Sequence, residues 1–370
     1  MLNRVWSGKM LLAHKIELRP TEMQAEYLDR ACGSKRHAFN QLLSHFSQDG
    51  VKWSKKAANE VYKQLRLTFP WYGEVSQRVT RNTIDDLDNA FKHFFRRVKL
   101  GEKAGYPTFK KRGVNDSFAL REKEKFHVVG RTLRIEKLKT PIKMRQQLRF
   151  VGEARQVTIS KRAGKYFASI LVETQDYNPK DANRAASVGV DFGIKELATC
   201  SNGVVFAASQ KLKASLNRLA RKQRKLAKQV RGSNRYAKTK LSIAKLHKRI
   251  ADQRQAIAHQ VSDYLTAHFD RIVIEDLNVS GMVKNRKLAR AVADCGFYML
   301  RQQLEYKAAL RNCELVVASR WFASSKICSG CGAVKKSLPL SERAYDCDHC
   351  STSLDRDLNA SINLNNYMVV

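Results

Sequence analysis

The chain has 370 residues, of which 43% are hydrophobic, so it is long enough to bury two or three cores. It carries 69 Lys and Arg against 34 Asp and Glu, a formal net charge of +35. An excess of this size indicates a polyanionic partner, although a basic surface that is merely solvated is the alternative. No run of about 18 uncharged apolar residues is present, so we expect no transmembrane helix and no membrane partner. We expect no signal peptide at residues 1–15.

The first half of the chain predicts a small barrel with helices inserted into it. Residues 10–19 alternate as a strand, and Thr21 is placed to cap a helix. Helical periodicity continues to about residue 100, and strand patterns fill residues 117–176. The loop at 96–112 is basic and carries two aromatic residues, which suits either a nucleic-acid contact or a solvated linker.

The second half alternates strands and helices after a linker expected at residues 177–187. A strand ends at Asp191, and Asn202-Gly203 predicts a hairpin turn. Two long helices are expected over 211–254, broken near Gly232. Further elements are expected as a strand at 271–277, a helix at 290–312, a strand at 314–318 and a helix from 357 to about 367.

The predicted helical pair is strongly basic on one face. Sixteen of its residues are Lys or Arg and one is acidic, while leucines and isoleucines recur beneath them at helical spacing. We therefore expect one face to pack and the other to meet phosphate.

Eight cysteines divide into two groups. Cys32, Cys200, Cys295 and Cys313 are scattered among apolar neighbours, as small core residues are. This usage is typical of a reducing compartment and predicts a cytoplasmic, nucleoid-associated protein.

The other four cysteines form two Cys-x2-Cys pairs separated by 15 residues, namely Cys328, Cys331, Cys347 and Cys350. Two such pairs can surround one tetrahedral Zn²⁺, and four thiolates leave no open position, so we expect a structural zinc. A redox dithiol is the alternative, and it needs only one pair; His349 is an alternative ligand.

Three acids occupy positions that are not typical of ordinary solvent-exposed surface residues. Asp191 and Glu275 end apolar strands, and Asp357 opens the last helix. A buried carboxylate needs a partner, and the pattern fits an RNase H-like or integrase-like sheet whose carboxylates hold two Mg²⁺ for phosphodiester hydrolysis. Taken singly, helix capping explains Asp357 or Asp355, and a salt bridge explains Glu275. Asp276 is expected to point to the opposite face from Glu275.

These motifs together resemble TnpB (also called OrfB), the RNA-guided nucleases of bacterial transposons that are ancestral to type V CRISPR effectors. The matching stretches are residues 188–195, 274–282, 301–308, 324–332 and 355–363, with a looser match at 105–110.

The resemblance implies an α/β multidomain protein with a RuvC-type nuclease domain whose triad is Asp191, Glu275 and Asp357. It implies a guide RNA from the transposon end that directs Mg²⁺-dependent cleavage of double-stranded DNA beside a short element-specific motif. The expected division is a wedge-like β-barrel at 1–20 and 101–180, a helical recognition domain at 21–100, a RuvC-like domain at 185–325 and 351–370, and a zinc finger at 326–350.

Two alternatives remain open at this stage. One is an RNA-guided DNA-binding repressor without nuclease activity, whose usual mark is a lost carboxylate, and none is lost here. The other is a transposase, or a transposase accessory protein, that uses the same acids.

Overall fold

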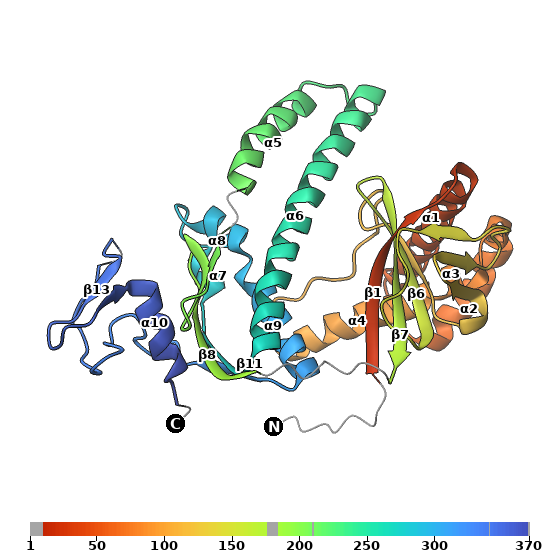
Figure 1. Cartoon of the computed structure of the whole chain (residues 1–370). Helices are drawn as coiled ribbons and strands as arrows, with labels where there is room; N and C mark the ends of the chain where they lie inside the picture. Colours follow the sequence, from red (N-terminus) through yellow and green to blue (C-terminus); the bar gives the residue numbers. More distant parts are fainter. Residues whose placement is uncertain (1–9, 176–183, 209–210, 340, 369–370) are drawn as a thin grey trace. The chain divides into compact units, whose positions relative to one another are not determined.

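The computed structural model describes residues 10–175, 184–208, 211–339 and 341–368 (Figure 1). The chain forms two compact units, Met1–Asn178 and Pro179–Val370. Most of the linker expected at 177–187 lies outside the described residues, but Ala185 already begins a strand, so that prediction was too long. The part of the chain described here contains no helix long and apolar enough to cross a membrane.

The first unit is built on one curved, seven-stranded antiparallel sheet (Figure 1). Its order is β2-β6-β7-β1-β5-β4-β3, so β1 lies in the middle although it comes first in the chain. Alternate residues of β1, such as Ile16 and Leu18, are buried in the core of this sheet. The strands are β1 (Met10–Arg19), β2 (Ser117–Leu120), β3 (Phe126–Val129), β4 (Thr132–Ile135), β5 (Ile142–Met144), β6 (Glu153–Arg162) and β7 (Lys165–Thr174).

The helices of the first unit come between β1 and β2, as the periodicity predicted. Thr21 caps α1 in a capping box, accepting from the Gln24 backbone while the Gln24 side chain accepts from the Thr21 backbone. Phe39, Phe46 and Phe91 meet in a separate apolar core. The elements are α1 (Glu22–Phe46), α2 (Lys55–Thr68), the short 3-10 helix η1 (Pro70–Glu74), α3 (Gln77–Arg81) and α4 (Thr83–Lys99); a second 3-10 turn, η2 (Lys123–Lys125), follows β2.

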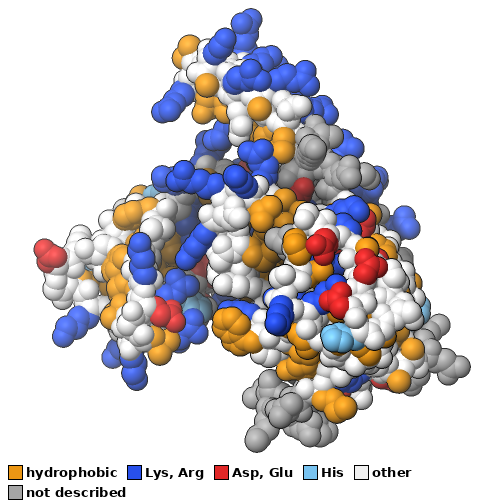
Figure 2. All heavy atoms as spheres, turned by 90° about the vertical axis from the view of Figure 1, so that its left-hand side faces the viewer, with side chains coloured by type: hydrophobic (Ala, Val, Ile, Leu, Met, Phe, Trp, Pro, Cys, Tyr) orange, Lys and Arg blue, Asp and Glu red, His pale blue; other side chains and the backbone are white. Residues whose placement is uncertain are grey.

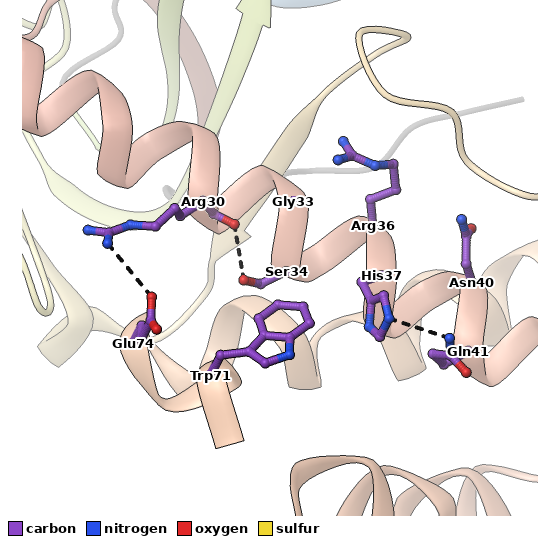
Figure 3. A pocket seen from close by; sticks show the side chains of 9 residues that line it. All are labelled: Arg30, Gly33, Ser34, Arg36, His37, Asn40, Gln41, Trp71 and Glu74. Carbon is purple, nitrogen blue, oxygen red and sulfur yellow. Dashed lines mark hydrogen bonds and ion pairs between the residues drawn. The ribbon is translucent and has the colours of Figure 1, made fainter. Parts of the chain in front are cut away.

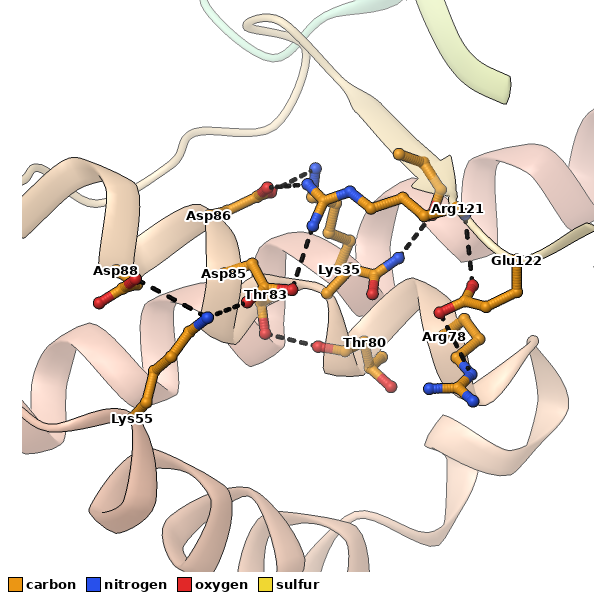
Figure 4. Close-up of polar contacts among 12 residues, drawn as sticks. Lys35, Lys55, Arg78, Thr80, Thr83, Asp85, Asp86, Asp88, Arg121 and Glu122 are labelled. Carbon is orange, nitrogen blue, oxygen red and sulfur yellow. Dashed lines mark hydrogen bonds and ion pairs between the residues drawn. The ribbon is translucent and has the colours of Figure 1, made fainter. Parts of the chain in front are cut away.

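An ion-pair network fixes α4 inside this unit (Figure 4). Asp86 of α4 pairs with Lys35 of α1 at 2.7 Å and with Arg121, next to β2, at 3.1 Å. Asp85 pairs with the same Arg121 and with Lys55 of α2. The network therefore joins the helices to the sheet.

A cavity of about 510 Å³ lies between α1 and η1, with Trp71 at its edge and His37 on its wall (Figure 3). Polar side chains on its wall already have partners: His37 Nδ1 lies 2.7 Å from the Tyr72 hydroxyl, and Arg30 pairs with Glu74. None of the predicted site residues lines this cavity.

The second unit contains a five-stranded sheet of order β10-β9-β8-β11-β12. Strands β8, β11 and β12 are parallel to one another, β9 runs antiparallel to β8, and β10 runs antiparallel to β9. The predicted turn at Asn202-Gly203 joins β9 to β10, with Gly203 at a φ of +84°. The strands are β8 (Ala185–Asp191), β9 (Glu196–Cys200), β10 (Val205–Ala207), β11 (Phe269–Glu275) and β12 (Glu314–Ala318).

Three helix and strand boundaries differ from the predictions. Helix α6 (Asn234–His268) runs fourteen residues past the expected end at 254, because its apolar stripe continues into the core of the unit through Val261 and Leu265. The helix expected at 290–312 is divided into α8 (Ala289–Cys295) and α9 (Phe297–Arg311) by Gly296, which has a φ of +67°. Strand β11 ends at Glu275, so Asp276 lies beyond it.

The remaining elements of this unit are α5 (Lys211–Ala227), α7 (Val279–Met282), β13 (Ala344–Asp346), β14 (Ser353–Asp355) and α10 (Arg356–Asn365). Helices α5 and α6 form the predicted basic hairpin, in which Leu216 and Leu219 pack against Leu246 and Ile250. Lys and Arg cover the outer part of this hairpin, at the top of Figure 2. Its exposed cations include Arg218, Arg221, Arg224, Lys225, Lys228, Arg231, Arg235, Lys238 and Lys240.

Candidate active site and metal centre

Two of the predicted acids end adjacent parallel strands. Val190 of β8 lies opposite Ile274 of β11, and Asp191 and Glu275 are the next residue of each strand. Carboxyl ends of parallel strands meet at one edge of a sheet, which is where ligands bind in open α/β sheets. The register thus brings residues 84 positions apart in the sequence (275 minus 191) to one place.

Helix α10 brings the third acid to the same edge. It packs against β8 at Gly189, where an added Cβ would lie 2.0 Å from the Ser361 carbonyl oxygen and 2.3 Å from the Asn365 backbone nitrogen. Only glycine allows this approach. Asp357 is the second residue of α10, while Asp355 caps the helix by accepting from the Asp357 and Leu358 N–H groups.

The three carboxylates influence one another electrostatically. Burial raises the pKa of Asp191 well above its usual range, and the charges of Glu275 and Asp357 raise it further. Burial also raises the pKa of Glu275; the hydrogen bond from Ser324 opposes this rise, and the charge of Asp357 adds to it. Acids that repel one another inside a fold favour a bound cation over the empty site.

Ser324 is a further residue of this site. Its hydroxyl donates to Glu275 Oε1 at 2.6 Å, and its own carbonyl oxygen accepts from Asn363 Nδ2 of α10 at 2.7 Å. Residue-by-residue reasoning on the sequence did not single it out. The available signal was the Ser324-Ser325-Lys326 segment leading into the first cysteine pair.

Asp276 takes a different role from its neighbour Glu275. It pairs with Arg301 at 2.9 Å and with Arg320 at 2.6 Å. The hydrogen bond from Arg301, supported by Arg320, lowers the pKa of Asp276, so it remains an anion held by two cations. This agrees with its exclusion from the predicted triad.

The four predicted cysteines lie together as a candidate zinc centre. The four sulfur atoms all lie within 4.8 Å of one another, with Cys328 and Cys350 3.7 Å apart and Cys331 and Cys347 3.6 Å apart. Sulfurs placed tetrahedrally about 2.3 Å from zinc are separated by about 3.8 Å, so the donor set fits that metal. All four are free cysteines, and His349 is not part of the cluster.

The polypeptide around this cluster favours the thiolate form of Cys328 and Cys350, whereas hydrogen bonds among the four sulfur atoms raise the pKa of Cys331 to about 12. Burial would raise the pKa of Cys328, but the N–H groups of Cys331 and Gly330 outweigh it and bring the pKa to about 6. Side-chain hydrogen bonding to Thr352 lowers the pKa of Cys350 as well. The thiolate is the form that binds a metal.

Within the described residues, this cluster is the one group of three or more Cys, His, Asp or Glu whose ligand atoms lie within 4.8 Å. The carboxylate oxygens of Asp191, Glu275 and Asp357 do not all lie within 4.8 Å of one another, so they are farther apart than the ligand atoms of a single ion.

Comparisons with known proteins agree with the motifs. A family model described as "Probable transposase" (OrfB_IS605) matches residues 169–286, and one described as "Cas12f1-like, TNB domain" matches residues 297–364. A protein of Streptomyces pristinaespiralis named "Putative RNA-guided DNA endonuclease" is 35% identical over 95% of this chain and 88% of its own length. The chain belongs to the TnpB (OrfB) family.

Other similarities extend this result. An Escherichia coli K12 protein named "Putative RNA-guided DNA endonuclease InsQ" is 30% identical to this TnpB-family chain. The match covers 96% of this chain and 92% of the E. coli protein. The cryo-EM structure of CasPhi-2 (Cas12j) bound to crRNA aligns with 96% of this chain and 98% of its own chain, at 9% sequence identity and a TM-score of 0.44. A third family model, described as a helix-turn-helix domain, matches residues 10–48, yet these residues form β1 and the single helix α1.

Proposed function

We propose that this TnpB-family protein is an RNA-guided, Mg²⁺-dependent DNA endonuclease that cuts target DNA next to a short element-specific motif. The observation that carries the proposal is the convergence of Asp191, Glu275 and Asp357 at one sheet edge, where burial, and then the charges of the other two acids, raise the pKa of Asp191. The strand order β10-β9-β8-β11-β12, with acids at the ends of β8 and β11, supports an RNase H-like (RuvC) domain. The names of the relatives support a guided nuclease.

The same three carboxylates would hold the metal. Carboxylate oxygens are the ligands that Mg²⁺ prefers, and a spread wider than one ion's shell suits two ions. Bound Mg²⁺ would activate the attacking water and stabilise the leaving oxygen of the phosphodiester. Ser324 would orient Glu275, and α10 would fix Asp357 against β8.

We assign the parts of the chain as the sequence predicted them. The sheet with β1 (1–20 and 101–180) would be the wedge-like barrel, 21–100 the recognition helices, 185–325 and 351–370 the nuclease domain, and 326–350 a structural zinc finger. A guide RNA from the transposon end and double-stranded target DNA would both bind to the positively charged surface of the protein. Much of that charge lies on the α5–α6 hairpin.

The test is guided cleavage by the purified full chain. RNA that copurifies is sequenced, and targets with randomised flanks are incubated with the complex in Mg²⁺ and in EDTA. We expect cleavage beside one short motif in Mg²⁺ and none in EDTA. Asp191→Ala should lose cleavage, by roughly 10³-fold or more, while target affinity stays within about twofold, because the change removes a metal ligand and leaves the cationic surface intact.

Each alternative gives another result. Guided binding without cleavage by the wild-type complex would identify a repressor. Joining of DNA ends in place of hydrolysis would identify a transposase. Equal cleavage by Asp191→Ala would remove the assigned site altogether.

A further inference from the structure

The edge of the sheet that carries the acids continues into a hollow surface on one side. Three cavities of about 320, 510 and 200 Å³ meet around Arg320, and two of them include Glu275. Helix α9 and the loop after β12 form the wall of this hollow surface. Ala318, the last residue of β12, lies opposite Glu275. This surface is called the β12 groove below.

Two arginines stand in the β12 groove with hydrogen-bonding capacity left over. Arg301 uses Nε on Glu305 and Nη1 on Asp276, while Arg320 uses Nε and Nη2 on Asp276. Within the residues that the structure describes, Arg301 Nη2 and Arg320 Nη1 have no partner. Asp276 thus holds both guanidinium groups in place and leaves one amine of each for a further acceptor, such as a phosphate oxygen.

Two aromatic rings border the same groove. Trp321 is 89% exposed, and Tyr298 is 65% exposed with its hydroxyl accepting from Gln302. Large exposed rings beside arginines are the arrangement by which proteins hold unpaired bases, since every base offers a face for stacking. In a duplex the neighbouring base pairs cover those faces, so the rings favour a single strand.

The acids in the groove do not prevent a nucleic-acid strand from binding there. Glu275 belongs to the carboxylate site, and Asp276 and Glu305 are each already paired with an arginine. The groove therefore offers hydrogen-bond donors and stacking surfaces next to the carboxylates, at the edge where parallel strands end.

We propose that the β12 groove binds the single strand of nucleic acid that leads into the carboxylate site, with Arg301 and Arg320 on a phosphate and Tyr298 and Trp321 stacked on bases. The inference rests on the proposed nuclease function for the direction of the strand, but binding in the groove is measurable without cleavage. Asp276 is a positioning residue that fixes the two arginines.

The experiment uses the full chain with Asp191→Ala, so that bound DNA stays intact. A single-stranded oligothymidylate of about 12 nucleotides, within the size that one binding surface covers, carries 5-iodouracil at each position in turn. It is irradiated with the protein, and the crosslinked residue is identified by mass spectrometry. We expect crosslinks at Trp321 or Tyr298, and at least tenfold fewer with a fully paired duplex of the same sequence.

Substitutions measure the role of the groove in the reaction. Trp321→Ala and Arg320→Ala, in an otherwise wild-type chain, should slow guided cleavage by roughly tenfold each, the scale of one lost stacking or bidentate contact. Trp321→Phe should restore most of the rate because it keeps a ring, whereas Arg320→Lys should restore little because it loses the fork. Val205→Ala is the control, an exposed residue in β10 at the opposite edge of the same sheet.

The outcomes separate this inference from the proposed function. Crosslinks at Trp321 or Tyr298 in a chain that never cleaves DNA would support the groove and reject the nuclease. Normal cleavage by both alanine variants, with crosslinks elsewhere, would overturn the groove and leave the nuclease intact. Equal crosslinking by the duplex would also overturn the groove, since the rings would not then be selecting unpaired bases.

Discussion

One hydroxyl group orients the carboxylate of Glu275. Ser324 is 4% exposed, and its Oγ lies 2.6 Å from Glu275 Oε1. Partners that fix a metal ligand commonly contribute 10- to 100-fold to metal affinity. Ser324→Ala should therefore raise the Mg²⁺ concentration needed for half-maximal cleavage by about 10- to 100-fold, measured by Mg²⁺ titration of the guided reaction.

Ser325→Ala is the matched control and should leave the Mg²⁺ requirement within about twofold. An unchanged requirement in Ser324→Ala would mean that Glu275 is oriented without its hydroxyl bond, or that Glu275 does not bind the metal.

At this scale the sequence indicated which acids and cysteines the fold brings together, but it did not indicate the residues around them. Strand ends and Cys-x2-Cys spacing indicated Asp191, Glu275 and the cysteines directly. Ser324 is 49 residues from Glu275, and nothing local to a serine reveals such a contact. The need for glycine at position 189 likewise becomes evident only in the folded structure, where the backbone of α10 packs against it.

Among the elements, α4 is fixed by a network of ion pairs. Burial would raise the pKa of Asp86, but Lys35, with Lys110 and Arg121, holds it below its ordinary value of 3.8 (Figure 4). A carboxyl whose pKa is depressed in the folded state stabilises the fold above the unfolded value, and this contribution is lost as the pH falls through the folded pKa.

Asp86→Asn should accordingly lower the free energy of unfolding of the first unit by about 1–3 kcal/mol at pH 7. The difference from wild type should shrink as the pH falls below 3.8, measured by denaturant unfolding across that range. Asp85→Asn is the control: Asp85 is 42% exposed against 22% for Asp86, so it should cost less than about 1 kcal/mol. Equal losses in the two variants would show that burial of the network does not matter.

Boundaries of elements were predicted where local signals exist and missed where tertiary contacts decide. The helix cap at Thr21 and the turn at Asn202-Gly203 are local, and both were predicted correctly. Gly296 interrupts a helical pattern that reads as continuous, because α9 turns to pack Leu300 and Leu304 in the core of the second unit. The apolar stripe of α6 extends past residue 254 in the sequence, through Ile257 and Val261, but the basic run ends at 254 and the helix end was placed there.

For the molecule as a whole, the four-cysteine cluster and the carboxylate site are joined by hydrogen bonds through α10. Asn359 and Asn363 of that helix donate to the Ile327 carbonyl oxygen at 2.8 and 2.6 Å, directly before Cys328, and Asn359 accepts from the Ser329 N–H. Buried asparagines four residues apart inside a helix thus link it to the first cysteine pair. Asp357 is on the same helix, so a disordered cysteine cluster should loosen the acid as well.

Removal of the metal should consequently affect one unit and spare the other. We expect purified protein to contain about one zinc per chain, and Cys328→Ser or prolonged chelation to lower the melting temperature of the second unit by about 10 °C or more, because structural zinc contributes directly to folding. The first unit shares none of these contacts and should melt unchanged, which differential scanning calorimetry resolves as a second transition. Cleavage should fall with the zinc content even at saturating Mg²⁺, since α10 no longer fixes Asp357.

Cys295→Ser separates loss of zinc from loss of a sulfur atom. Cys295 is half-buried in the second unit, outside the cluster, and its replacement should shift that transition by no more than about 3 °C. A zinc-free chain that melts and cleaves normally would show that α10 is held by packing on Gly189 alone. If both transitions shifted together, the two units would be unfolding as one, and the carboxylate site would then depend on the whole chain and not on the local link through α10.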